Sequence, residues 1–146
     1  MKRYAKALIG FSALGTLNAL YLTILFLRTK WAEHVSSVCD INATTSCTSV
    51  ITSPFARFLG VPVCSIALIV YPLLIALGIA ALRRRRTRDL FYGASLLAAM
   101  GLMLNVVYVY NEFVHIGAVC ILCVGCTVLI ALDLIASVRG YQLSAD

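Results

Sequence analysis

Four of the six cysteines in this 146-residue chain form two pairs that could exchange disulfides. Cys39 and Cys47 lie in the polar stretch "VCDINATTSC", and Cys120 and Cys123 form a CxxC motif in the apolar stretch "AVCILCVGC". Residues three apart on a helix share a face, so a helical CxxC brings its two sulfurs together. A helix N-terminus also stabilises a thiolate. The CxxC therefore combines a reactive outer thiol with a nearby resolving thiol.

Each pair also has a structural interpretation. Cys39 and Cys47 could form a staple that closes a short loop. Cys120 and Cys123 could be inert, because a buried free cysteine packs like a small hydrophobic residue. Four cysteines could bind zinc, but structural zinc sites usually take two close pairs on loops or knuckles. Here one pair is widely spaced and the other lies in an apolar segment, so we expect no metal.

The composition indicates a membrane protein. Hydrophobic residues make up 62% of the chain and its mean hydropathy is +0.96, which is too apolar for a soluble domain of this size. Four apolar runs are each about 20 residues long, enough to cross a hydrocarbon core of about 30 Å as helices. We therefore expect one all-α integral membrane domain over 1–146, an up-down-up-down bundle of four transmembrane helices. The four runs are 7–27, 61–82, 90–110 and 116–138.

The first run is expected to be a retained helix. It is too long for a typical signal-peptide core, and no small-residue cleavage site follows it.

The basic residues predict the orientation of the bundle. They cluster in residues 2–6, in "RRRRTR" at 83–88 and at Arg139, so these segments and both chain ends are expected to be cytoplasmic. The net charge of +6 has this topological explanation, and we expect no nucleic-acid partner. The long loop 29–60 and both cysteine pairs then face the extracytoplasmic side, where disulfides persist.

The long outer loop is expected to fold over the mouth of the bundle and to bring Cys47 near Cys120. Within it, Ser53 can cap a short interfacial helix that begins at Pro54. Asn105 in the third run is a polar residue inside an apolar span, where an asparagine tends to face the bundle interior and often forms interhelical hydrogen bonds. Cys64 and Cys126 are interpreted from the sequence as packing residues.

The motifs "CDINATTSC", "TSP" and "CILC", in this order and topology, resemble the vitamin K epoxide reductase family over about residues 7–138. The resemblance implies that Cys120 and Cys123 are the active-site pair, with Cys123 facing a quinone. It implies that Cys39 and Cys47 are a shuttle pair, in which Cys47 exchanges with Cys120. It also implies that electrons come from a thioredoxin-fold protein.

Two positions depart from the vertebrate members of that family. Cys64 stands where they carry a quinone-binding asparagine, and Thr127 stands where they carry a tyrosine. These departures favour a prokaryotic-type, single-domain relative that reduces a quinone of the ubiquinone or menaquinone class. Only "RGYQLSAD" follows the fourth run, so the thioredoxin-fold partner is expected to act in trans. The expected quinone-contacting residues are Ser53, Phe55, Cys64, Asn105 and Thr127.

The sequence therefore predicts a quinone-dependent thiol:disulfide oxidoreductase that supports disulfide bond formation. Its expected location is the bacterial or archaeal cytoplasmic membrane, or the endoplasmic reticulum membrane of a eukaryote. One alternative is a vitamin K quinone or epoxide reductase of the vertebrate type. Another is a non-enzymatic membrane scaffold with a stapled loop. A scaffold would tolerate the loss of Cys123, whereas a relay requires all four thiols.

Overall fold

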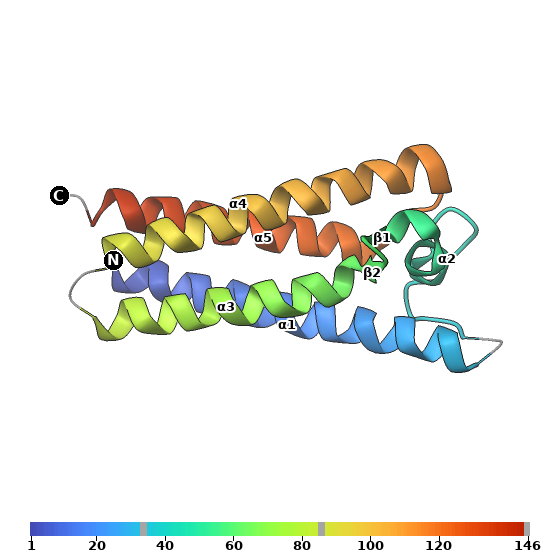
Figure 1. The fold of residues 1–146 in the computed structure, drawn as a ribbon, viewed down its shortest axis with the longest axis horizontal. Coiled ribbons are helices and arrows are strands. Elements are labelled where there is room, and N and C mark those ends of the chain that lie inside the picture. The colour runs from blue at the N-terminus through green and yellow to red at the C-terminus, as the bar shows by residue number, and fades with distance from the viewer. Residues whose placement is uncertain (33–34, 85–86, 145–146) are drawn as a thin grey trace.

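The computed structural model describes residues 1–32, 35–84 and 87–144, and four long helices make up most of it (Figure 1). The helices lie side by side as an up-and-down bundle, with the N- and C-termini at the same end. Each is long and apolar enough to cross a membrane, which confirms the predicted all-α four-helix membrane fold. They are α1 (Lys2–Trp31), α3 (Val63–Arg83), α4 (Arg88–Asn111) and α5 (Ile121–Gln142).

Short elements close the end of the bundle opposite the termini. The short helix α2 (Cys47–Thr52) and one 3-10 turn, η1 (Pro54–Ala56), come from the long loop. Strands β1 (Arg57–Phe58) and β2 (Val61–Pro62) then pair antiparallel. Their two-residue turn has positive φ at both positions, as a tight hairpin requires, so the chain reverses soon after η1. A π-helical turn, η2 (Glu112–Ile116), extends α4 at the same end.

The start of α5 explains how the CxxC is presented. The expected fourth run began at 116, but Gly117 has a φ of 69° in the left-handed region and ends η2. Residues up to Cys120 are therefore non-helical, and α5 begins at Ile121. Cys120 is the N-cap residue, and Cys123 lies in the first turn. The other helices also differ by a few residues from the runs, and Arg85 and Arg86 of the basic run lie outside the described residues.

Close packing around α1 sets the position of α5. A Cβ atom on Gly15 would meet ring atoms of Tyr71 in α3 at 2.3–2.6 Å, so this glycine is what lets the ring lie against α1. Small residues of this kind allow membrane helices to approach closely. The Tyr71 hydroxyl then donates to the carbonyl oxygen of Cys126 at 3.0 Å. One buried tyrosine thus joins α1, α3 and α5 just below the CxxC.

A buried polar contact ties α1 to α5 in the half of the bundle nearer the termini. Ser12 Oγ donates to Asp133 Oδ2 at 3.0 Å, and both residues are 0% exposed. Asp133 Oδ1 has no hydrogen-bond partner among the described residues. Leaving a buried acceptor without a partner is costly, so Ser12 is important for accommodating this carboxyl group.

We expect Ser12→Ala to lower the free energy of unfolding by about 1–3 kcal/mol, because Asp133 then loses its hydrogen-bond donor. Unfolding of the protein reconstituted in lipid bicelles measures this change. Adding Asp133→Leu to Ser12→Ala should restore much of the loss, because no polar group is then left unpaired. If Ser12→Ala alone is as stable as the parent chain, the Ser12–Asp133 hydrogen bond contributes nothing to stability.

Candidate redox site

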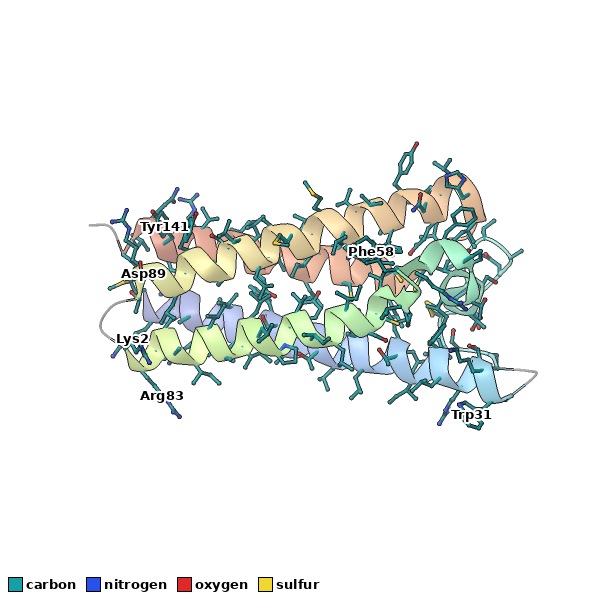
Figure 2. All side chains as sticks on the ribbon, viewed as in Figure 1. Lys2, Trp31, Phe58, Arg83, Asp89 and Tyr141 are labelled. Atoms are coloured by element: carbon teal, nitrogen blue, oxygen red, sulfur yellow. A yellow bond between two sulfur atoms is a disulfide. The ribbon has the colours of Figure 1, made fainter. Side chains whose placement is uncertain are left out.

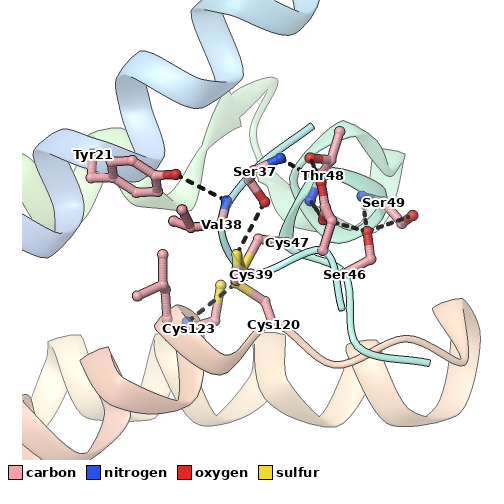
Figure 3. Close-up of a disulfide and its surroundings, with 12 residues drawn as sticks. Tyr21, Ser37, Val38, Cys39, Ser46, Cys47, Thr48, Ser49, Cys120 and Cys123 are labelled. Carbon is pink, nitrogen blue, oxygen red and sulfur yellow. Dashed lines mark hydrogen bonds between the residues drawn. A yellow bond between two sulfur atoms is a disulfide. The ribbon is translucent and has the colours of Figure 1, made fainter. Parts of the chain in front are cut away.

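The two cysteine pairs meet between the folded loop and the start of α5 (Figure 3). This is the end of the bundle opposite the termini (Figure 1). Cys39 and Cys47 form a disulfide, whereas Cys120 and Cys123 are free thiols. The Sγ atoms of Cys47 and Cys120 are only 2.9 Å apart, although 73 residues separate them in the chain. Attack of one of these sulfurs on the other needs no large movement, so the arrangement suits thiol–disulfide exchange.

A third sulfur completes this group. The Sγ atoms of Cys39, Cys47 and Cys120 all lie within 4.8 Å of one another. Metals bind cysteine as thiolate, and two of these three sulfurs are already bonded to each other. The arrangement of the three sulfurs therefore suits disulfide exchange.

The chain before α5 aims the Cys120 sulfur at the loop. Cys120 Sγ accepts a hydrogen bond from the Cys123 backbone N–H at 3.3 Å, as an N-cap side chain does. The Cys120 backbone N–H donates to Glu112 Oε2 at 3.1 Å. One residue earlier, the Val119 N–H donates to the Thr44 carbonyl oxygen at 2.8 Å, which joins this segment directly to the loop. The sulfur contact is thus held by backbone bonds on both sides.

Asp40 organises the loop around the disulfide. Its carboxylate accepts from the Ser37 N–H at 2.7 Å, from the Ser46 hydroxyl at 2.7 Å and from the Thr48 hydroxyl at 2.6 Å. Burial alone would raise the pKa of Asp40, but the hydrogen bonds from Thr48, Ser37 and Ser46 outweigh it and hold that pKa well below its usual range. One charged side chain thereby connects the segments that carry both loop cysteines.

Apolar side chains exclude water from the sulfur contact. Cys47 and Cys120 are both 0% exposed, and Cys39 is 6% exposed. They belong to one buried cluster that draws on α1, α2 and the segment before α5. The members besides these cysteines are Leu22, Leu25, Phe26, Val50, Ile51 and Ala118.

An apolar cavity of about 240 Å³ lies beside the site, between α3, α4 and α5, with parts of α1, α2 and η1. Cys123 lines this cavity, whereas Cys120 does not. The CxxC therefore has one thiol facing the loop disulfide and the other facing the cavity. The lining is mostly aliphatic, with Cys64, Asn105 and Glu112 among its few polar side chains. An apolar slot with a few polar groups fits a quinone ring.

The structure places the expected quinone-contacting residues in two groups. Cys64 and Asn105 line the cavity. Thr127 is one contact away from it, because its hydroxyl accepts from Asn105 Nδ2 at 3.0 Å and donates to the Cys123 carbonyl oxygen at 3.1 Å. Ser53 and Phe55 lie outside the cavity. Ser53 caps η1 through the Phe55 N–H at 3.3 Å, and the Phe55 ring stacks on His115 at 4.9 Å.

Two polar residues contribute to the site beyond those singled out as quinone contacts. Glu112 is 2% exposed and lines the cavity, although "NEFVH" reads as a polar link between spans. The sequence does carry a signal for Glu112: it is an acidic residue that stands between two apolar segments, shortly before a CxxC. Asn18 of α1 donates to the Leu122 carbonyl oxygen at 2.8 Å and to Cys126 Sγ at 3.1 Å. It therefore anchors the first turns of α5 rather than facing lipid.

A comparison of the sequence with protein-family models matches residues 6–138 to the vitamin K epoxide reductase family. A search of curated proteins gave no match. The matched residues include both cysteine pairs and all four long helices, except the first turn of α1 and the last turn of α5.

We expect Asp40→Asn to loosen the loop at neutral pH, because an amide supplies one acceptor oxygen in place of two charged ones. Hydrogen exchange at the Ser37 and Thr48 amides should become about tenfold faster, equivalent to about 1.4 kcal/mol. Mass spectrometry of exchange in lipid nanodiscs measures this difference. Unchanged protection would show that other contacts hold the loop.

The same carboxylate predicts a pH dependence. Because the pKa of Asp40 is lower in the folded loop than in an unfolded chain, its stabilisation is complete above an unfolded pKa of about 3.9. It is lost as the pH falls from that value toward the lower folded pKa. Wild-type loop protection, corrected for intrinsic exchange, should therefore stay constant from pH 7 to pH 5. Loss of loop protection between pH 7 and pH 5 would contradict the role of Asp40.

Proposed function

The chain belongs to the vitamin K epoxide reductase family, and we propose that it relays electrons from a reduced thioredoxin-fold protein to a quinone through its two cysteine pairs. Family membership and four spanning helices make it a membrane thiol/quinone oxidoreductase. The electron path, the partner in trans and a quinone of the ubiquinone or menaquinone class are our proposal. The observation that carries it is the 2.9 Å separation of the Cys47 and Cys120 sulfurs.

In the first step, the partner reduces the Cys39–Cys47 disulfide. A thiolate of the partner attacks Cys39 of the loop disulfide and releases Cys47 as a thiolate. The partner's second thiol then attacks the mixed disulfide, so the partner leaves oxidised and the loop pair is reduced. The flanking residues Val38 and Ile41 are 87% and 67% exposed, so a partner can approach this segment. Cys39 itself is 6% exposed and becomes accessible by a local movement of the loop.

The second step passes the electrons to the CxxC. The Cys47 thiolate attacks Cys120 of a closed Cys120–Cys123 disulfide and releases Cys123 as a thiolate. Cys39 then attacks Cys47, which restores the loop disulfide and releases Cys120. The observed form, with the loop pair oxidised and the CxxC reduced, corresponds to the product of this step. The Cys123 N–H at 3.3 Å from Cys120 Sγ favours the departing thiolate.

Direction follows from reduction potentials, and about 30 mV between two dithiol pairs corresponds to about 1.4 kcal/mol. A bound quinone supplies the final acceptor of two electrons, chemistry that side chains cannot provide. Cys123 would be the thiol nearest to it, and Asn105 and Cys64 would hold it. The Thr127 hydroxyl, which accepts from Asn105 Nδ2, would keep the Asn105 amide turned toward the cavity.

We further propose that both termini are cytoplasmic and that the cysteines face the extracytoplasmic side. Lys2 and Arg83 lie at the same end of the bundle as Asp89 and Tyr141, opposite Trp31 and Phe58 (Figure 2). Arg28, Lys30 and Arg57 lie toward the opposite end. The other described basic residues lie at the terminal end, so the bias supports this orientation by the positive-inside rule. On the opposite side, the partner can support disulfide bond formation in exported proteins.

The relay predicts a trapped intermediate. In Cys39→Ala/Cys123→Ala, neither resolving thiol is present, so we expect a Cys47–Cys120 disulfide to accumulate in an oxidising membrane. Non-reducing electrophoresis and mass spectrometry of the linked peptides identify it. Cys39→Ala/Cys120→Ala is the matched control and should give no such link. If Cys47 stays free in the first variant, the loop disulfide is a structural staple and electrons enter at Cys120 directly.

The cavity predicts a separable effect on quinone use. We expect Asn105→Leu to raise the KM for a soluble quinone analogue about tenfold, the effect of losing about 1.4 kcal/mol of binding. Disulfide exchange between Cys47 and Cys120 should be unaffected, because Asn105 contacts neither residue. Steady-state quinone reduction in nanodiscs measures the KM. An unchanged KM would place the quinone elsewhere.

A further inference from the structure

Glu112 is a buried carboxyl group that the electron path above does not use. It is 2% exposed and belongs to the last turn of the α4–η2 segment. Its Oε2 atom accepts the Cys120 backbone N–H at 3.1 Å, and its side chain lines the cavity. The Glu112 carboxyl group therefore contacts the Cys120 backbone, interacts with the Cys123 side chain and reaches the cavity. Among the described residues lining the cavity, it is the one carboxyl group.

Closure of the Cys120–Cys123 disulfide requires a route to the cavity for the protons of both thiols. Forming the Cys120–Cys123 disulfide breaks two S–H bonds and releases two electrons and two protons, which together convert one quinone to one quinol. The Cys123 thiol lines the cavity and can deliver its proton there directly. Cys120 is 0% exposed and does not line the cavity, so its proton has no direct route to the same place.

We propose that Glu112 carries the proton of Cys120 into the cavity as the Cys120–Cys123 disulfide closes. The carboxyl group gives up a proton on the cavity side and regains one from the Cys120 thiol, so it is unchanged after each turnover. Two protons and two electrons leave the dithiol, one proton through Cys123 and one through Glu112. This inference rests on the proposed function, in which the cavity holds the acceptor.

The other groups around the cavity are less suited to this role. A tyrosine hydroxyl holds its proton more tightly than a carboxyl group does, and so does a thiol. Asn105 has no proton to exchange at neutral pH. The remaining ionisable side chains on the cavity wall are Cys64, Tyr71, Tyr108, Cys123 and Cys126. His115, which precedes the CxxC in the chain, is exposed and stacks on Phe55 away from the cavity wall.

Glu112→Gln tests the proposal because glutamine keeps a carbonyl oxygen for the Cys120 N–H but cannot carry a proton. We expect quinone-coupled closure of the reduced CxxC to slow about 10²-fold or more, as for loss of a general acid–base group. Single-turnover measurements with a soluble quinone analogue in nanodiscs give this rate. Glu112→Asp, which keeps a carboxyl group, should recover part of it.

A quinone-free measurement gives an independent test. The carboxyl group ends each turnover unchanged, but its surroundings change when the neighbouring Cys120 passes from thiol to disulfide. We therefore expect the infrared difference spectrum between the two forms to contain a shifted carboxyl band that Glu112→Gln removes. Asp133→Asn is the matched control, because Asp133 is the other buried carboxyl group among the described residues and lies away from the cavity. It should leave that band in place. A difference spectrum without a Glu112 band would overturn the proposal.

Two further outcomes separate proton transfer from simple support of the turn. Adding Glu112→Gln to Cys39→Ala/Cys123→Ala should leave Cys47–Cys120 disulfide formation unchanged, because the turn is still held. If this disulfide is lost, Glu112 positions Cys120 and the proposal is wrong. Closure at the wild-type rate in Glu112→Gln also overturns it. If the wild-type chain itself does not reduce the quinone analogue, the proposed function fails instead, which is a distinguishable result.

Discussion

The redox site depends on the contact between the Cys47 and Cys120 sulfurs, and the surrounding structure maintains this contact. Thiol–disulfide exchange needs two sulfurs at near-contact distance, and here they are 2.9 Å apart without exposure to water. One belongs to a loop and the other to the first residue before a helix, so neither element alone determines their separation. The backbone bond from Val119 to Thr44 and the carboxylate of Asp40 hold the loop over the helix end. The redox site is therefore a property of the folded end of the bundle.

The bundle below gives the two CxxC thiols different surroundings. Because Cys120 is the N-cap and Cys123 lies one turn later, one thiol meets the loop and the other meets the apolar cavity. Asn18 of α1 and Tyr71 of α3 both bond to the first turns of α5, which fixes the rotation of that helix. A rotated α5 would turn Cys123 away from the cavity. Helix packing thus places the two CxxC thiols in separate surroundings, as the proposed exchange and quinone steps require.

The spanning helices could be predicted from the sequence because their signal is local: a run of about 20 apolar residues specifies a membrane helix by itself. The helical CxxC was predicted only in part, because Cys120 is the N-cap of α5 and its thiol meets the loop, whereas Cys123 meets the cavity. Details that depend on tertiary contacts were not predictable in this way. Glu112 reads as part of a polar link, but the helical segment continues past 110 and carries Glu112 on the same cavity-facing side as Asn105 and Tyr108. Ser53 and Phe55 are expected at the quinone, but they lie outside the cavity, where Ser53 caps η1 and Phe55 stacks on His115. Their part in quinone binding stays a prediction.

The order of thiol reduction tests the central claim most directly. The fully oxidised protein, in nanodiscs without quinone, is mixed with a reduced thioredoxin-fold dithiol protein and quenched at successive times with an alkylating reagent, and mass spectrometry locates the free thiols. The account predicts that Cys39 and Cys47 become reduced first and are then reoxidised as Cys120 and Cys123 become reduced. In Cys120→Ala the loop pair should stay reduced. Reduction of the CxxC while the loop disulfide remains closed throughout would contradict a relay through the loop.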